Sequence, residues 1–101
     1  MKAKYAVIFR SKLKQSHEGY DEMAIKMEVE VSKMPGFVEM IHARNEIGIT
    51  ICYWTDLKSI ENWKNQSSHR EAQQKGKDLW YQFYQLEVVE ILKSYDSGKS
   101  E

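Results

Sequence analysis

The sequence predicts an α+β fold in which two helices cover one face of an antiparallel four-stranded sheet. In four short segments apolar residues alternate or run together, as they do in strands. In the intervening segments they recur at steps of three and four, as they do along one face of a helix. The predicted order is strand, helix, strand, strand, helix, strand.

The first half of the chain contains a strand and a long helix. Tyr5–Phe9 is an aromatic and β-branched run bounded by charged residues, and its apolar side chains fall on both faces of a strand. A helix is predicted from about Glu18 to Met34, beginning near Ser16 or His17. Pro35 and Gly36 are expected to end it, because the residue before proline avoids helical geometry. The apolar stripe of this helix comprises Tyr20, Met23, Ala24, Met27, Val31 and Met34.

A hairpin is predicted next. Its strands are Phe37–Ala43 and Ile47–Trp54, and the short polar segment 44–46 connects them. Simple alternation places four residues on one face of the second strand: Ile47, Ile49, Ile51 and Tyr53.

The second helical region is predicted in two parts. Asp56 can cap a helix whose Leu57, Ile60 and Trp63 share one face. The stretch 68–71 matches the S-x-x-E capping box, so a further helix is predicted to begin at His69. Gly76 is expected to end that helix. A last strand is predicted over Phe83–Leu92, where apolar residues alternate again.

This order of elements is that of a ferredoxin-like βαββαβ domain, predicted here over residues 1–92. Residues 93–101 are expected to form a flexible tail, because the polar stretch after Tyr95 offers no apolar anchor. Two helices cover only one face of such a sheet, whereas the first and last strands are apolar on both faces. We therefore predict a homodimer in which two copies pack sheet against sheet.

Composition excludes several classes of function. The 101 residues contain 15 basic and 15 acidic side chains, so the chain lacks the positive surface that nucleic acid or a membrane surface requires. The apolar run at residues 5–9 is too short for a signal peptide or a membrane span. The lone Cys52 is expected to be a buried, inert thiol. These features predict a soluble, cytoplasmic protein.

Motifs for common cofactors are absent. The histidines His17, His42 and His69 have no metal-binding spacing, and all five glycines are isolated, so no phosphate-binding loop is predicted. The notable segment is 63–86, which holds two Trp, two Tyr, a Phe and a His. These rings either close the core or line a pocket for a flat ligand. In the second case His69, in the first turn of a helix, would be neutral and could accept a proton.

Three segments give the chain a resemblance to the antibiotic biosynthesis monooxygenase family: MPGFVEMIHARNE, ITICYWTDLKSIENWKNQSSHREAQQKGKDLWY and YQLEVVEI. Members of this family form dimeric α+β barrels from two ferredoxin-like halves, and the resemblance covers Tyr5 to about Leu92. It implies oxidation of a flat aromatic or quinol-like molecule by O2 without metal or flavin, so no cofactor is expected.

The resemblance also implies a set of site residues. Trp63 falls where the family has a pocket tryptophan, His69 is our predicted base, and Asn62 or Arg70 could donate hydrogen bonds to a developing oxyanion. Trp80 and Tyr84 would line the cavity. The predicted catalytic residues are therefore His69, Trp63 and Asn62, and the predicted substrate-binding residues are Arg70, Trp80 and Tyr84.

Two alternatives stay open. A related branch of the family binds and degrades haem, but here the first strand lacks the asparagine of that branch. Gln73 stands near the position of its histidine ligand, and glutamine is a poor axial ligand for haem iron. Haem binding would then depend on His69. The other alternative is a dimer that binds a small ligand, or has a structural role, without turnover.

Overall fold

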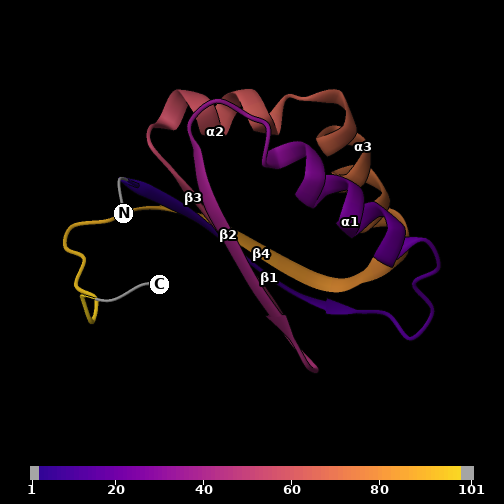
Figure 1. The fold of residues 1–101 in the computed structure, drawn as a ribbon. Coiled ribbons are helices and arrows are strands. Elements are labelled where there is room, and N and C mark those ends of the chain that lie inside the picture. Colours follow the sequence, from indigo (N-terminus) through magenta and orange to yellow (C-terminus); the bar gives the residue numbers. More distant parts are fainter. Residues whose placement is uncertain (1–2, 99–101) are drawn as a thin grey trace.

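Four strands and three helices follow one another in a computed structural model that describes residues 3–98 (Figure 1). The predicted α+β, ferredoxin-like order is confirmed. The elements are β1 (Tyr5–Leu13), α1 (Tyr20–Val31), β2 (Phe37–Arg44), β3 (Gly48–Trp54), α2 (Leu57–Lys64), α3 (Ser67–Lys75), the π-helical turn η1 (Gly76–Trp80) and β4 (Tyr81–Glu90).

The strands form one antiparallel sheet in the order β2-β3-β1-β4. All three helices lie on the same side of it, which leaves the other side bare (Figure 1). Residues that pair across neighbouring strands point to the same face. The row through Val7 and Cys52 therefore faces the helices, and the next row, through Ile8 and Ile51, faces away from them.

The core lies between the helices and one end of the sheet. Val31 of α1, Trp54 of β3 and Trp63 of α2 are its buried centre, and Val7 and Cys52 from the sheet pack against them. Half-buried side chains complete the core: Met27, Met34, Phe37, Met40 and Ile60. The three methionines of this set pack against the buried centre, where a flexible thioether adapts to an irregular space.

The bare face of the sheet carries exposed apolar side chains on β2, β3 and β4, next to a polar group of Arg10, Gln85 and Glu87 on β1 and β4. Ile41 and Ile49 are 49% and 42% exposed, and Phe83 and Val89 of β4 are also exposed. A shallow hollow of about 230 Å³ lies over β2 and β3 and is lined by Ile41, His42, Ala43, Ile49 and Ile51. The predicted alternation along β3 is thus confirmed, and so is the expectation that two helices cover only one face.

Several predicted boundaries are wrong by a few residues. Helix α1 begins at Tyr20 after Gly19, which has a positive φ of 87°, and it ends at Val31, so it is shorter at both ends than the predicted Glu18–Met34. Strand β1 continues to Leu13 because β4 pairs with it along its whole length. Strand β4 accordingly starts at Tyr81, two residues before the predicted start.

The second helical region also differs from the prediction at the ends of its helices. Asp56 caps α2 as predicted, since its Oδ1 accepts a hydrogen bond from the amide of Ser59 at 2.7 Å. Helix α3 begins at residue 67 with Gln66 as its N-cap, so the predicted start at His69 is wrong. Gly76 does not end the helical path, which continues through the π-helical turn η1.

The chain leaves the sheet after Glu90, and the amide of Ile91 donates to the carbonyl of Lys4 at 2.9 Å. Leu92 and Tyr95 are highly exposed. Residues 99–101 of the predicted tail lie outside the described residues, and the flexibility of the tail stays a prediction. No helix within residues 3–98 is long and apolar enough to span a membrane.

Candidate functional site

His69 lies against Trp63, and the two rings are the centre of the candidate site. Trp63 is on the buried face of α2 and is only 8% exposed. The imidazole of His69, in the first turn of α3, stacks on the indole with ring centroids 4.5 Å apart and an interplanar angle of 14°. The break between the two helices at residues 65–66 folds α3 back so that the rings meet.

Gln66 fixes this break and links it to α1. Its side-chain oxygen accepts a hydrogen bond from the amide of His69 at 2.9 Å, which caps α3. Its side-chain nitrogen donates to the carboxylate of Glu30 at 3.0 Å. Since each end of the Gln66 amide has a distinct partner, both the start of α3 and the position of His69 are set relative to α1.

The hydrogen bond of the imidazole defines its tautomer. Nδ1 of His69 lies 3.0 Å from the carbonyl oxygen of Trp63, and a carbonyl oxygen only accepts, so Nδ1 carries the proton. The pKa of His69 is lowered, mainly because burial disfavours the imidazolium. The neutral ring then keeps a lone pair on Nε2. The predicted direction is confirmed, although burial, not the helix N-terminus, is its main cause.

Asn62 and Arg70 are neighbours of the stacked pair in sequence but not in contact with it. Asn62 is exposed on α2 and Arg70 is exposed on α3. Within residues 3–98, neither side chain forms a hydrogen bond or an ion pair. The structure therefore does not add either residue to the cluster of Trp63 and His69.

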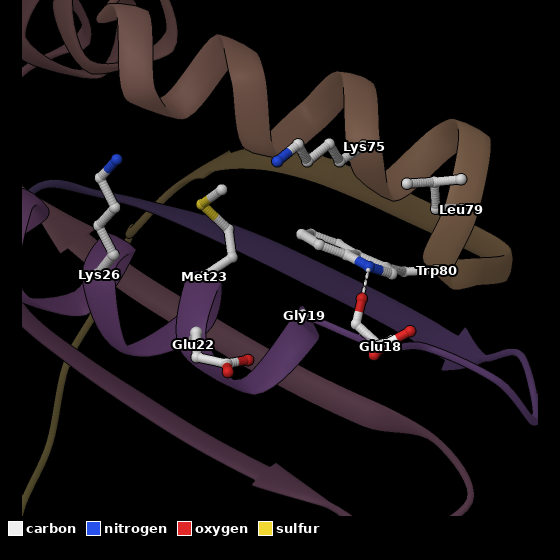
Figure 2. Close-up of a pocket in the computed structure, with 8 residues that line it drawn as sticks. All are labelled: Glu18, Gly19, Glu22, Met23, Lys26, Lys75, Leu79 and Trp80. Carbon is white, nitrogen blue, oxygen red and sulfur yellow. Dashed lines mark hydrogen bonds between the residues drawn. The ribbon is translucent and has the colours of Figure 1, made fainter.

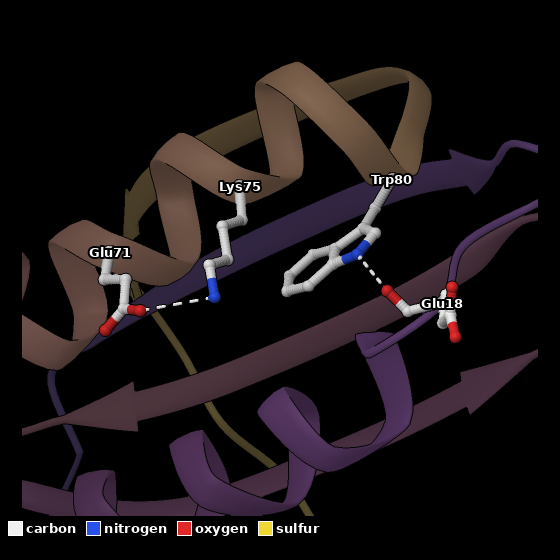
Figure 3. A network of polar contacts seen from close by, with 4 residues as sticks. All are labelled: Glu18, Glu71, Lys75 and Trp80. Carbon is white, nitrogen blue, oxygen red and sulfur yellow. Dashed lines mark hydrogen bonds and ion pairs between the residues drawn. The ribbon is translucent and has the colours of Figure 1, made fainter.

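Trp80 and Tyr84 belong to a different part of the molecule. The indole nitrogen of Trp80 donates to the carbonyl of Glu18 at 3.0 Å (Figure 3), and its ring meets the edge of Tyr20 at the start of α1. Gln66 and His69, in contrast, are tied to Glu30, ten residues further along α1. At 1.5 Å per residue the two regions are about 15 Å apart along the helix axis.

An open groove of about 410 Å³ separates α1 from α3 and η1 (Figure 2). Trp80 points into it, and Lys75 at its edge is paired with Glu71 at 3.3 Å (Figure 3). His69, Trp63 and Tyr84 do not line it. Its lining residues are Glu18, Gly19, Glu22, Met23, Lys26, Lys75, Leu79 and Trp80. The predicted site residues thus fall into two regions of the fold, with His69 and Trp63 in one and Trp80 and Tyr84 in the other.

The sequence analysis missed Gln66, although its position three residues before His69 is the spacing of an N-cap. It also missed Arg44, which lies at the end of β2 and contacts Tyr20. No local pattern marks Arg44, because only the pairing of distant strands brings it there. Among the described residues, no three His, Cys, Asp or Glu side chains are grouped as a metal site would need.

Two curated proteins that resemble the chain were found by sequence. YqjZ of Bacillus subtilis, itself uncharacterized, is 35% identical over 89 residues, which cover 86% of this chain and 78% of YqjZ. Jasmonate monooxygenase ABM of Pyricularia oryzae is 29% identical over 100 residues, which cover 94% of this chain. The match spans only 46% of that monooxygenase. No protein-family model matches the chain.

Solved structures share the fold at low identity. Rv0793 from Mycobacterium tuberculosis superimposes with a TM-score of 0.82 at 9% identity, over 93% of this chain and all (100%) of that one. SnoaB, a cofactor-independent oxygenase from Streptomyces nogalater, has a TM-score of 0.76 at 12% identity, over 91% of this chain and 96% of its own. These solved structures show the fold alone. The sequence relatives show the family: the chain belongs to the antibiotic biosynthesis monooxygenase family.

Proposed function

We propose that the protein is a cofactor-independent monooxygenase that oxidises a flat aromatic or quinol-like molecule with O2. The observation that carries this proposal is the neutral imidazole of His69, stacked on Trp63 with its Nδ1 proton fixed on a backbone carbonyl. An imidazole held in this way has a lone pair on Nε2, where it can accept a proton. Membership of a family of monooxygenases supports oxygenation as the reaction class.

The proposed chemistry draws all its electrons from the substrate and O2. His69 removes an acidic proton from the substrate, and the resulting anion transfers one electron to O2, which gives superoxide and a substrate radical. The two radicals combine to form a C–O bond and a peroxide. Loss of a second C–H proton then breaks the O–O bond, so that a carbonyl forms and water leaves. The balance is SH2 + O2 → S=O + H2O.

The other predicted residues keep supporting roles in this proposal. Asn62 and Arg70, next to the stacked pair in sequence, are proposed to donate hydrogen bonds to the developing oxyanion once a substrate is bound. Trp80 and Tyr84 are proposed to bind a part of the substrate remote from the reacting carbon. Trp80 and Tyr84 lie near the start of α1, about 15 Å along the helix axis from Glu30, to which the region of His69 is linked. This separation supports a role away from the reacting carbon.

We further propose that the protein acts as a homodimer whose sheets pack face to face. The support is the bare face, on which Ile41, Ile49, Phe83 and Val89 are exposed. A second copy with the same face would remove these side chains from water at about 25 cal/mol for each Å² of apolar surface. Dimer formation would also leave the helix side, with His69, accessible to substrate.

The direct test is oxygen uptake with 1,8-dihydroxyanthrone, a flat electron-rich phenol. We expect the protein to accelerate uptake above the spontaneous rate, with one O2 consumed for each anthraquinone formed. His69→Gln should reduce that acceleration at least about 100-fold, the usual contribution of a positioned acid or base. His17→Gln is the matched control, because the Nδ1 of His17 also faces a backbone carbonyl, that of Lys14 at 2.7 Å.

Full activity of His69→Gln would exclude His69 as the base. Absence of any acceleration with this and other hydroxyanthrones, while the ligand binds saturably, would favour the dimer that binds without turnover. A haemin titration separates the remaining alternative. A saturable shift of the haem absorption band that His69→Gln abolishes would identify His69 as an iron ligand instead of a base.

A further inference from the structure

One row of the sheet contains an arginine on the helix side. Arg44 of β2 pairs with Gly48 of β3, Gly48 with Ser11 of β1, and Ser11 with Tyr84 of β4. Because paired residues share a face, Arg44, Ser11 and Tyr84 all point to the side on which the helices lie. This row lies beyond the core, on the part of the sheet near the first residue of α1, Tyr20.

The guanidinium of Arg44 is fixed in place. Its Nη2 donates to the hydroxyl of Ser11 at 2.7 Å and to that of Tyr20 at 3.3 Å, and Ser11 is fully buried. Gly48 provides the space, since a Cβ there would lie 2.1 Å from Cζ of Arg44. No carboxylate in residues 3–98 lies within ion-pair distance of Arg44. A positioned cation without a counter-ion suits an anionic ligand.

Two phenol groups adjoin this cation. The Tyr20 ring lies 5.5 Å from Cζ of Arg44, and its centroid is 6.1 Å from that of Tyr81. Burial, followed by the proximity of Tyr20, raises the pKa of Tyr81, so Tyr81 stays a neutral hydrogen-bond donor. Gly76 permits this packing, because a Cβ there would lie 2.6 Å from Cε2 of Tyr81.

The half-buried ring of Phe9 and the exposed ring of Tyr84 continue the surface beside the phenols. The ring of Phe9 lies 5.4 Å from Tyr81 and 5.8 Å from Tyr84, with Tyr84 tilted by only 31°. Tyr84 is 41% exposed, and Leu86, two residues along the same face of β4, is also exposed. An apolar surface with aromatic character therefore adjoins the positive charge of Arg44 on the helix side of the sheet.

We propose that Arg44, Tyr20 and Tyr81 form a binding site for the carboxylate of a flat aromatic acid, whose ring lies on Phe9 and Tyr84. Arg44 supplies the charge and the two phenol hydroxyls supply hydrogen-bond donors. The site extends the proposed function by requiring an acidic group on the ligand. Binding needs no turnover, so failure of the oxygenase proposal would leave this site testable by itself.

The test is a calorimetric titration of the whole protein with 2-naphthoate and with 2-naphthalenemethanol, its neutral counterpart. We expect naphthoate to bind saturably and at least about tenfold more tightly, because hydrogen bonds to a charged group are the stronger kind. Equal affinity for the two compounds, or no saturable binding of naphthoate, would overturn the proposal. Naphthoate binding is measured without oxygen uptake, which keeps this result separate from the test of the proposed base.

Two variants locate the charge. Arg44→Gln should remove the preference for naphthoate, while Lys33→Gln, which removes an equal charge from an exposed turn, should keep it. Gly48→Ala retains every charge but displaces the guanidinium, so it should also lose the preference. Gly48 has no positive φ, so alanine fits its backbone and this variant should fold even if Arg44→Gln does not. Unchanged discrimination in folded Gly48→Ala would place the carboxylate elsewhere.

Discussion

The imidazole of His69 lies nearly parallel to the indole of Trp63, with the ring centroids 4.5 Å apart. The indole covers one face of the imidazole, and the carbonyl of Trp63 accepts the Nδ1 proton at 3.0 Å. One residue thus supplies both the ring that buries the histidine and the acceptor that sets its tautomer. Four predictions concern this stacked pair and the sheet on which the helices pack.

The stability of the protein should depend on the protonation of His69. Its pKa is lowered in the folded chain, whereas an unfolded histidine titrates near about 6.5. As the pH falls, the unfolded state therefore binds the proton before the folded state does. The free energy of unfolding that His69 contributes above about pH 6.5 is then lost as the pH falls towards the pKa of His69 in the folded chain. Urea unfolding from pH 8 to 5 should show a weaker pH dependence for His69→Gln than for the natural chain. Identical pH dependence would mean that His69 is not buried as described.

Removing the indole of Trp63 should destabilise the hydrophobic core. Trp63→Ala should lower the free energy of unfolding by about 3–5 kcal/mol, because it leaves a cavity beside Val31 and Trp54. Urea unfolding measures this loss. In the same variant, provided it folds, NMR titration should find the pKa of His69 closer to its ordinary value. Tyr95→Ala, at a highly exposed ring, should change stability by less than about 0.5 kcal/mol.

The bare face of the sheet should hold two copies together. We expect the natural chain to sediment as a dimer at micromolar concentration and Ile41→Lys to sediment as a monomer, because a lysine there would be buried without a partner. Ile25→Lys is the matched control, since Ile25 is 64% exposed but lies on α1. A dimer that survives Ile41→Lys and dissociates in Ile25→Lys would assign the interface to the helices.

Cys52 should react slowly while the protein is folded. Burial raises the pKa of its thiol to about 11, so very little thiolate exists at pH 8. Alkylation by iodoacetamide at pH 8 should therefore be much slower in the folded protein than in urea, where one equivalent should react readily. A rate equal to that of the unfolded chain would show that β3 opens to solvent on the timescale of the reaction.

Local sequence patterns predicted the elements where their causes are local. Asp56 precedes α2 and caps it through the amide of Ser59, three residues away, so the sequence pattern contains the whole interaction. The cap of α3 was predicted wrongly for the opposite reason. The S-x-x-E match at 68–71 predicted a start at His69, but Gln66 is the cap, and its side chain also donates a hydrogen bond to the carboxylate of Glu30 on α1.

The sequence by itself determined the order of strands and helices, the apolar stripe of α1 and the surplus of apolar residues on the sheet, because periodicity records which side of each element is buried. The tertiary structure decided which ring-bearing residues lie beside Trp63 and which lie near the start of α1. The turn at Gln66 brought His69 onto Trp63, and the π-helical turn η1 carried Trp80 to the other end of α1. The position of Arg44 beside Ser11 depends on strand order and register, which join residues 33 positions apart and leave no local pattern.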